Sequence, residues 1–313
     1  MALAPDLITA LSAVEGLDLL LDEPLAPHTS FRIGGPADAL CTTHTAAALS
    51  SVLRLALERG VPVVVLGRGT NVLVRDGGVR GIVLRLGGEF VRVQVQGTTL
   101  VAGGAAALEE AAWAACWAGL SGLEWAAGIP GSVGGAVVMN AGTADGEMRD
   151  VAEDAEIMAR DGSARRLTRE ELALGYRRSA LQGRDDIVVR VRLALQPGDP
   201  MQVQACMEGL LRAREAKQPL RWPSAGCMFK RPEGDYAGRL IEAAGAKGLR
   251  VGDAQVAPQH ANFVINLGQA TAAEVLALVA KVREMVRAQF GVELEQEVHV
   301  VGEDAPTEEA VLR

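Results

Sequence analysis

The chain has few cysteines and no closely spaced pair of them. Its 313 residues include four, Cys41, Cys116, Cys206 and Cys227, and this spacing argues against both a zinc site and a disulfide framework. The N-terminus has no basic stretch followed by an apolar core, so we expect no signal peptide. An uninterrupted run of about 18 apolar residues is also missing, so no membrane-spanning helix is expected. These absences predict a soluble, cytoplasmic protein without a metal centre.

Two familiar nucleotide-binding sequences are missing as well. No Gly-Lys-Ser or Gly-Lys-Thr occurs, so there is no Walker loop, and no Gly-x-Gly-x-x-Gly opens a helix as in the Rossmann fold. The formal net charge of −8 disfavours nucleic acid as a partner. It does not exclude a small anionic ligand, because Phe229-Lys230-Arg231 and Arg239 form a basic patch in an otherwise acidic C-terminal third.

A glycine-rich segment from Gly128 to Gly142 is the most informative part of the chain. It reads Gly-Ile-Pro-Gly-Ser-Val-Gly-Gly-Ala-Val-Val-Met-Asn-Ala-Gly and contains no charged side chain. Backbone N–H groups in such a segment can approach a ligand closely and form a concave site for an anion, for which phosphate or pyrophosphate is the natural guest. The alternative is a loop whose glycines only allow two elements to pack closely.

A second glycine segment lies between two short apolar runs. The sequence Gly67-Arg68-Gly69-Thr70-Asn71 follows the apolar residues 61–66 and precedes Val72-Leu73-Val74. A glycine turn between two strands presents N–H donors and the threonine hydroxyl to a phosphate at the edge of a sheet. Two such segments in one chain suggest a single ligand with a long, phosphate-bearing body.

The chain length favours more than one domain, because a single hydrophobic core rarely extends over 313 residues. Strands and helices alternate in the first part of the chain, which indicates an α/β module over residues 1–88. A second module over 89–200 ends where Pro197-Gly198-Asp199-Pro200 punctuates the chain. Residues 201–313 form the last domain. We therefore predict a multi-domain fold of mixed α/β class.

Hydrophobic periodicity and capping residues predict the individual elements. Capping boxes at Thr168 and Thr271 begin two helices, and the second helix runs to Phe290 with Gly291 as its C-terminal cap. The other expected elements are helices over 45–59 and 105–117 and a helix ending near 217, and strands over 61–66, 72–74, 81–86, 91–96, 100–102, 187–195 and 292–301.

Three further motifs carry polar side chains suited to chemistry. They are Tyr176-Arg177-Arg178-Ser179, Pro223-Ser224-Ala225-Gly226-Cys227-Met228-Phe229-Lys230, and Glu295-Gln296-Glu297-Val298. Together with the glycine segments and with Thr29-Ser30-Phe31-Arg32-Ile33-Gly34-Gly35-Pro36, they occur in the order found in one family. On these motifs the chain resembles the UDP-N-acetylenolpyruvoylglucosamine reductases, the flavoenzymes of peptidoglycan synthesis, over roughly residues 25–302.

The resemblance implies a fold and a reaction. Residues 1–88 and 89–200 would be two FAD-binding subdomains of the vanillyl-alcohol-oxidase type, and residues 201–313 an α+β domain that binds the UDP-sugar. FAD would be bound noncovalently and reduced by NADPH. UDP-N-acetylglucosamine enolpyruvate would then receive a hydride at C3 and a proton at C2, giving UDP-N-acetylmuramate. We expect a cytoplasmic monomer of the family's shorter variant, which lacks an extra tyrosine-bearing loop.

Arg177 is the residue that the resemblance implies for the substrate carboxylate. Hydride addition builds negative charge on the carboxylate oxygens, and a permanently charged guanidinium can bind them through two hydrogen bonds. From the sequence alone, the alternative is an exposed arginine at a helix end.

Cys227 stands where the family usually has the serine that donates a proton to C2. A thiol, with a reference pKa of about 8.5, is protonated at neutral pH and is a stronger acid than an alcohol, so the replacement need not abolish the step. The alternative is a small buried cysteine without a catalytic role. We hypothesise that Cys227 is the acid.

Glu297 would assist the enol intermediate or its protonation. Strand periodicity alone places it on a solvated face with Glu293, Glu295 and His299, so its role is implied by the family ending and not by the pattern. Lys230 would reach the UDP phosphates or the substrate carboxylate, and Arg239 and Asn262 are further candidates for substrate contact. His260 is either a general base or a structural histidine.

The two glycine segments would hold FAD from two sides. The residues expected to bind it are Gly67, Arg68, Gly69, Thr70, Asn71, Gly128, Ile129, Gly131, Ser132 and Gly135. The nearest rival function is another FAD-dependent oxidoreductase of this fold, acting on a sugar, lactone or hydroxy acid. Its first two domains would look alike, so the motifs around Arg177, Cys227 and Glu297 distinguish the reductase. A rival from another class is a catalytically silent nucleotide-binding module.

Overall fold

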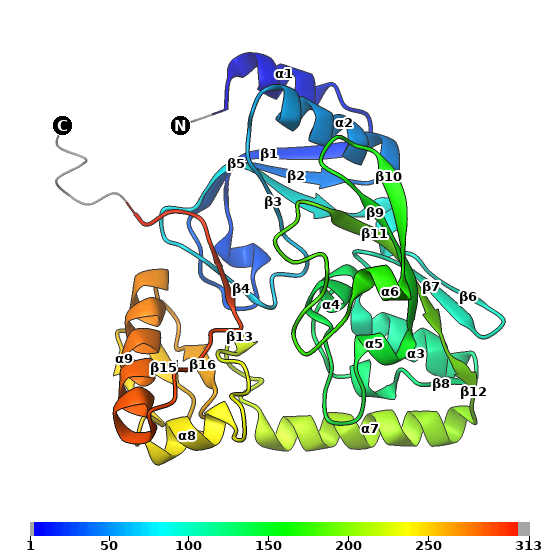
Figure 1. Ribbon diagram of the computed structural model, residues 1–313. Helices are drawn as coiled ribbons and strands as arrows, with labels where there is room; N and C mark the ends of the chain where they lie inside the picture. The colour runs from blue at the N-terminus through cyan, green and yellow to red at the C-terminus, as the bar shows by residue number, and fades with distance from the viewer. Residues whose placement is uncertain (1–2, 306–313) are drawn as a thin grey trace, which may run out of the picture. The chain divides into compact units, whose positions relative to one another are not determined.

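The computed structural model describes residues 3–305 of the chain (Figure 1). The chain divides into two compact units, each formed by segments far apart in the sequence. The first unit comprises residues 3–21, 39–68 and 81–214, and the second comprises 22–38, 69–80 and 215–305. The expected division into three domains at residues 88 and 200 is not decided by these two units and stays a prediction.

The main sheet of the first unit is five-stranded and antiparallel, in the order β10-β9-β11-β7-β6. The strands predicted at 91–96 and 100–102 form a hairpin, in which β6 pairs with β7 in a register that sets Val93 opposite Ala102. Alternate residues of these strands, among them Leu100 and Ala102, are fully buried against helices. The strands are β6 (Val93–Gln96), β7 (Thr99–Gly103), β9 (Ala152–Met158), β10 (Ala164–Thr168) and β11 (Ile187–Ala194).

Helices cover one face of this sheet (Figure 1). They are α3 (Leu108–Trp117), α4 (Val133–Met139), α5 (Met148–Val151) and α6 (Arg169–Leu172). The helix predicted to begin at the Thr168 capping box is confirmed, but it is a single turn, because Ala173 takes a left-handed conformation (φ 45°) and ends it. The predicted helix over 105–117 starts three residues later, at Leu108.

A second core of the first unit lies under α1 (Pro5–Ser12) and α2 (Ala46–Glu58). The Thr45 hydroxyl accepts the Ala48 N–H and caps α2, as the pattern predicts. The associated sheet has the order β1-β2-β5-β3. Its strands are β1 (Leu17–Pro24), β2 (Pro36–Thr43), β3 (Val63–Val65) and β5 (Val79–Leu86), and β3 runs parallel to β5.

The second unit has a four-stranded sheet in the order β13-β16-β15-β14, against which the long helix α9 (Ala272–Phe290) packs. Both predicted ends of α9 are confirmed: Thr271 and Glu274 form the capping box, and Gly291 is left-handed at the C-terminal cap. The carboxylate of Asp76 also accepts the Ala272 and Ala273 N–H groups at 2.8 and 2.9 Å. The sheet strands are β13 (Ser224–Cys227), β14 (Arg250–Val251), β15 (Ala254–Val256) and β16 (Phe263–Asn266).

The remaining elements are short, except for one helix. They are β4 (Val72–Val74), β8 (Leu120–Ser121), β12 (Gln196–Pro197), β17 (His299–Val301), α7 (Pro200–Lys217), α8 (Ala237–Ala243), and the 3₁₀ turns Ala26–His28, Gly88–Val91 and Glu124–Ala126. None of the helices formed by residues 3–305 combines the length and the apolar character needed to cross a membrane.

Two further sequence expectations differ from the structure. The strand expected over 292–301 is wrong in extent, since only β17 pairs regularly, in parallel with β4. The residues before it make single contacts, such as the bridge between Phe229 and Gln296. The glycine-rich segment is not a loop throughout, because Ser132 caps a helix that occupies residues 133–139.

Candidate functional site

In the second unit, Cys227 is the last residue of β13 and pairs with Phe263 of β16. It is half-buried beside an apolar cluster that includes Ala257 and Ile265. The next residue, Met228, donates its N–H to the Asn262 carbonyl at 2.7 Å. The thiol is therefore held at a fixed end of the sheet, where an apolar patch meets a polar turn.

Backbone hydrogen bonds place Glu297 next to this turn. Its N–H donates to the Met228 carbonyl at 2.8 Å, and its carbonyl accepts the Asn71 side-chain amide at 3.3 Å. Asn71 also accepts the His299 N–H at 3.1 Å through its own carbonyl. The structure thus brings together three residues that the sequence predicts for the site, from segments more than fifty positions apart: Asn71, Cys227 and Glu297.

Asn262 is buried, and its side chain bonds the backbone of Phe229 in the 223–230 motif. Its Oδ1 accepts the Phe229 N–H at 3.0 Å, and its Nδ2 donates to the Phe229 carbonyl at 2.8 Å. This pair of bonds satisfies both backbone polar groups of Phe229, which is buried. The sequence did not reveal this structural role. Its role as a substrate ligand stays a prediction.

His260 supports Asn262. Its Nδ1 accepts the Asn262 N–H at 3.3 Å, and its ring packs edge-on against Phe263 with centroids 4.9 Å apart. Burial lowers the pKa of His260, which favours the neutral ring. With Nδ1 accepting, the neutral ring carries its proton on Nε2. These contacts favour the structural interpretation of this histidine over the general base.

The predicted substrate-binding cations are engaged in ion pairs. Lys230 pairs with Glu295, and its N–H donates to the Glu295 carbonyl at 2.8 Å. Arg239 pairs with Asp235, and its hydrogen bond is the main reason that the pKa of Asp235 is lowered to about 2. Such surface ion pairs contribute little to stability, so exchange of a carboxylate for a ligand phosphate costs little.

The Thr29–Pro36 motif contacts strand β13, the strand that ends at Cys227. The Ser30 hydroxyl donates to the Ser224 carbonyl at 2.7 Å, and its N–H donates to the Gly69 carbonyl at 3.0 Å. Gly69 has a φ of +65°, and a Cβ there would lie 2.3 Å from the His28 carbonyl oxygen. Only glycine fits this position, so Gly69 of the second glycine segment is required for close packing of the backbone.

In the first unit, the two glycine segments meet. A Cβ on Gly67 would lie 3.0 Å from the Ser132 Oγ, so the two residues face each other with no side chain between them. The Ser132 hydroxyl accepts the Gly135 N–H at 3.2 Å and keeps its own hydrogen for another acceptor. This meeting is what a shared ligand requires.

The start of α4 is not an open cradle of N–H groups. Val133 and Gly134 donate to the Ala106 and Gly104 carbonyls at 2.9 and 2.8 Å, and Gly135 donates to Ser132. Three N–H groups of this segment are therefore satisfied within the protein. The other predicted residues of the segment have these surroundings: Gly128 lies against Arg214 and Leu211 of α7, Ile129 packs on the core, and the Gly131 carbonyl accepts the Leu108 N–H.

Arg177 lies in a tight turn of the first unit. Gly175 and Arg178 exchange two hydrogen bonds of 2.9 Å, which leaves Tyr176 and Arg177 at the tip. Arg177 has a φ of +50°, a conformation that non-glycine residues seldom adopt. Its guanidinium lies over the Tyr176 ring, 5.4 Å from the centroid. It is thus a turn residue and not the end of a helix.

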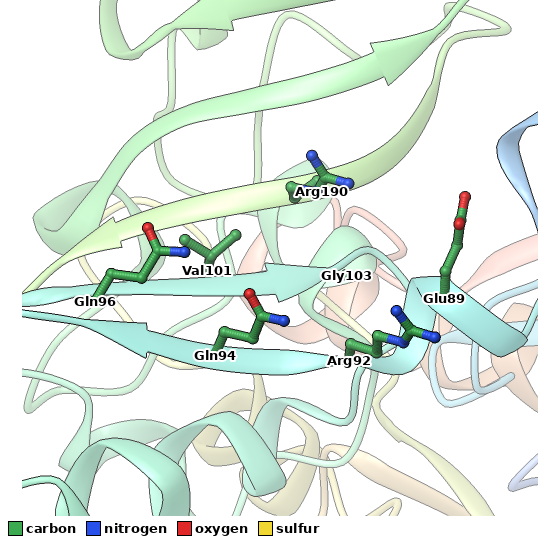
Figure 2. A pocket seen from close by; sticks show the side chains of 7 residues that line it. All are labelled: Glu89, Arg92, Gln94, Gln96, Val101, Gly103 and Arg190. Carbon is green, nitrogen blue, oxygen red and sulfur yellow. The ribbon is translucent and has the colours of Figure 1, made fainter.

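A separate hollow of about 270 Å³ lies on the outer face of the five-stranded sheet (Figure 2). Its lining side chains include Arg92, Gln94 and Arg190, which point to the same side of the strands. None of the residues predicted for the site lines it. We therefore do not assign the chemistry to this hollow.

The amide of Asn262 gives a stability prediction. Asn262→Ala leaves the buried Phe229 N–H and carbonyl without their partners and should lower the free energy of unfolding by about 2–4 kcal/mol. Chemical denaturation monitored by circular dichroism measures this change. Gln269→Ala, at an exposed side chain, is the control and should change stability by less than about 0.5 kcal/mol. Equal stability of Asn262→Ala and the wild type would show that the two hydrogen bonds between Asn262 and Phe229 do not stabilise the fold.

The chain is similar in sequence and in structure to one family of enzymes. Residues 218–301 match the C-terminal domain of UDP-N-acetylenolpyruvoylglucosamine reductase, and residues 37–168 match an FAD binding domain. UDP-N-acetylenolpyruvoylglucosamine reductase 2 of Symbiobacterium thermophilum is 51% identical over 280 residues, covering 90% of this chain and 91% of the relative. The Moorella thermoacetica reductase is 47% identical over 302 residues, covering 96% and 98%.

A solved structure agrees with the sequence relatives. The crystal structure of UDP-N-acetylenolpyruvylglucosamine reductase (MurB) from Thermus caldophilus is similar with a TM-score of 0.79 and 43% identity. The match covers 91% of this chain and 99% of that structure's chain. The similarity therefore extends over both units and is not confined to the flavin fold.

Proposed function

The chain belongs to the UDP-N-acetylenolpyruvoylglucosamine reductase family, and from this membership we propose that it reduces UDP-N-acetylglucosamine enolpyruvate to UDP-N-acetylmuramate. It is an FAD-containing oxidoreductase, and NADPH is the expected electron donor. The observation that carries the proposal is near-full-length identity of 47% to a reductase of this name. The proposal places the reaction in peptidoglycan synthesis, in the cytoplasm, with a monomer as the working form.

The residues of the first unit fit the cofactor. Gly67 and Gly135 both face the Ser132 hydroxyl without a side chain, which leaves backbone and one hydroxyl hydrogen for phosphate oxygens. We infer that the pyrophosphate contacts are made by the Ser132 hydroxyl and by the backbone before α4, and not by the N–H groups of 133–135. When bound, FAD would supply the hydride chemistry, with NADPH as the source of the hydride and C3 of the substrate as its acceptor.

Arg177 is proposed to stabilise the negative charge that develops on the substrate carboxylate. A guanidinium stays charged throughout, so it stabilises the transition state, in which further negative charge builds on the carboxylate oxygens, more than the singly charged substrate carboxylate. The tight turn limits the motion of its backbone, which supports a role that depends on position.

Cys227 and Glu297 are proposed for the protonation at C2. The thiol hydrogen of Cys227 passes to C2 and leaves a thiolate, which solvent reprotonates after release. Glu297 assists from the neighbouring segment, which the bonds to Met228 and Asn71 hold in place. Lys230, Arg239 and Asn262 are proposed to contact the UDP-sugar, the first two after exchanging Glu295 and Asp235 for phosphate or carboxylate oxygens.

The proposed function is tested by NADPH consumption with the FAD-loaded protein. We expect consumption that depends on UDP-N-acetylglucosamine enolpyruvate and yields UDP-N-acetylmuramate, identified by mass spectrometry. Flavin bleaching by NADPH without reoxidation by this substrate would indicate a different acceptor. Absence of bleaching would contradict the assignment of the electron donor.

Replacing the proposed acid separates the two half-reactions. In Cys227→Ala, stopped-flow absorbance should show unchanged flavin reduction by NADPH and flavin reoxidation by substrate slowed about 100-fold or more, since general acid catalysis contributes about 10²–10⁴. Cys227→Ser restores the residue usual in the family and should retain reoxidation. Cys206→Ala, at an exposed position on α7, is the control. Normal reoxidation in Cys227→Ala would rule out the thiol as the acid.

Filling the space at Gly67 tests the cofactor site. Gly67→Ala places a methyl group 3.0 Å from the Ser132 Oγ and should raise the Kd for FAD about tenfold, because overpacking of this kind costs about 1–3 kcal/mol. Titration of the cofactor-free protein, followed by quenching of FAD fluorescence, measures the Kd. Gly209→Ala, where a Cβ has no neighbour within 4 Å, is the control. Unchanged affinity in Gly67→Ala would place the pyrophosphate elsewhere.

A further inference from the structure

The turn that carries Arg177 is attached to the end of helix α4. Residues 175–178 form the turn, and α4 ends at Met139. Three side chains around the turn make the connection: Asn140, Ser179 and Gln182. None of the motifs that gave Arg177 its predicted role accounts for Asn140 or Gln182.

Asn140 holds the beginning of the turn. It is fully buried, and its Nδ2 donates to the Gly175 carbonyl at 2.9 Å and to the Glu147 carboxylate at 3.0 Å. Its Oδ1 accepts the Arg149 N–H at 2.8 Å. Its backbone is left-handed, with φ 42°, which asparagine tolerates better than most residues. Every donor of this amide is therefore used, and one of them fixes the residue from which the turn departs.

Gln182 and Ser179 hold the tip and the end of the turn. The Gln182 Nε2 donates to the Arg177 carbonyl at 3.0 Å and to the Val138 carbonyl at 3.2 Å. The Ser179 hydroxyl donates to the same Val138 carbonyl at 2.7 Å. One amide thus joins the peptide of Arg177 to the last turn of α4, whose carbonyls have no partner within the helix.

We propose that Gln182 and Asn140 are positioning residues that fix the Arg177 turn to the end of α4. They thereby hold Arg177 at a constant position relative to this helix, which begins at Ser132. This inference rests on the proposed role of Arg177. A left-handed arginine at the tip of a turn is a conformation of higher energy, and it persists only where its surroundings determine it. The Gln182 bond to the Arg177 carbonyl is the contact that acts on this peptide directly.

The test replaces the Gln182 amide without changing the length of its side chain greatly. In Gln182→Met, the Arg177 carbonyl loses the amide donor, while the Val138 carbonyl keeps the Ser179 hydroxyl. Reoxidation of the reduced holoenzyme by UDP-N-acetylglucosamine enolpyruvate should slow by about tenfold or more, since small misplacements of a binding group have effects up to about 10²-fold. Flavin reduction by NADPH and the Kd for FAD should stay within about twofold. Gln204→Met, on an exposed position of α7, is the matched control and should leave all three unchanged.

A second background separates positioning from a general structural effect. In Arg177→Ala, Gln182→Met should cause no further slowing, because a residue that acts only through Arg177 has nothing left to position. An equal slowing in both backgrounds would overturn the inference. If Gln182→Met alone has no effect while Arg177→Ala slows reoxidation, the inference fails and the proposed function stands. If Arg177→Ala itself has no effect, the proposed role of Arg177 fails and the inference fails with it.

Proteolysis gives a readout that needs neither cofactor nor turnover. Trypsin cleaves after Arg177 and Arg178 when the turn opens, and mass spectrometry identifies the sites. We expect cleavage there to be several-fold faster in cofactor-free Gln182→Met than in Gln204→Met, with cleavage elsewhere unchanged. Equal cleavage in the two variants would show that Gln182 does not hold the turn. Asn140→Ser, which keeps the capping position but shortens the side chain, should behave like Gln182→Met.

Discussion

The second unit depends on two hydrogen bonds between the Asn262 amide and the peptide of Phe229. They tie the segment after β13 to the segment before β16. The backbone of the segment after β13, at Met228 and Lys230, also forms hydrogen bonds with the backbone of Glu297 and Glu295. A buried backbone N–H or carbonyl without a partner costs about 1–3 kcal/mol, so the amide stabilises the path that both segments take. The positions of Cys227, Lys230 and Glu297 relative to one another follow from it.

The first unit uses the same device at a different place. Asn140 is a second buried amide, and both of its donors are used; it bonds the start of the Arg177 turn as Asn262 bonds the backbone that follows Cys227. Fully satisfied polar groups of this kind make a local structure rigid and specific, because any alternative path leaves a buried donor unpaired. Both segments that carry a proposed catalytic residue are thus held by a buried asparagine side chain.

The sequence predicted well those elements that local signals specify. The two ends of α9 were correct because Thr271, Glu274 and Gly291 act on the helix from within a few residues. The extent of the strand over 292–301 was wrong because periodicity describes which side chains are buried, not which backbone is paired. Leu294 and Val298 are indeed buried, yet only residues 299–301 find a neighbouring strand.

The sequence also indicated part of the candidate site. The structure brings together the predicted residues of the second unit. The structural roles of Asn140, Asn262 and Gln182 could not be predicted, because their partners are backbone groups of other segments. Glycine composition also could not separate ligand contact from close packing. A Cβ on Gly67 would meet only the Ser132 side chain, with the Oγ at 3.0 Å, whereas a Cβ on Gly69 would meet a carbonyl at 2.3 Å. Gly69 is therefore required for packing, and Gly67 is the glycine proposed to contact the ligand.

The basic patch shows why composition alone overstates an anion site. Lys230 is paired with Glu295, Arg239 with Asp235, and the Arg231 guanidinium lies 4.2 Å from the centroid of the Tyr236 ring. The local charge is thus largely compensated in the protein on its own. Because Glu295 is 71% exposed, its attraction to Lys230 is screened by water and salt. On the proposed function, a substrate phosphate, which brings more charge than one carboxylate, would replace Glu295 at Lys230.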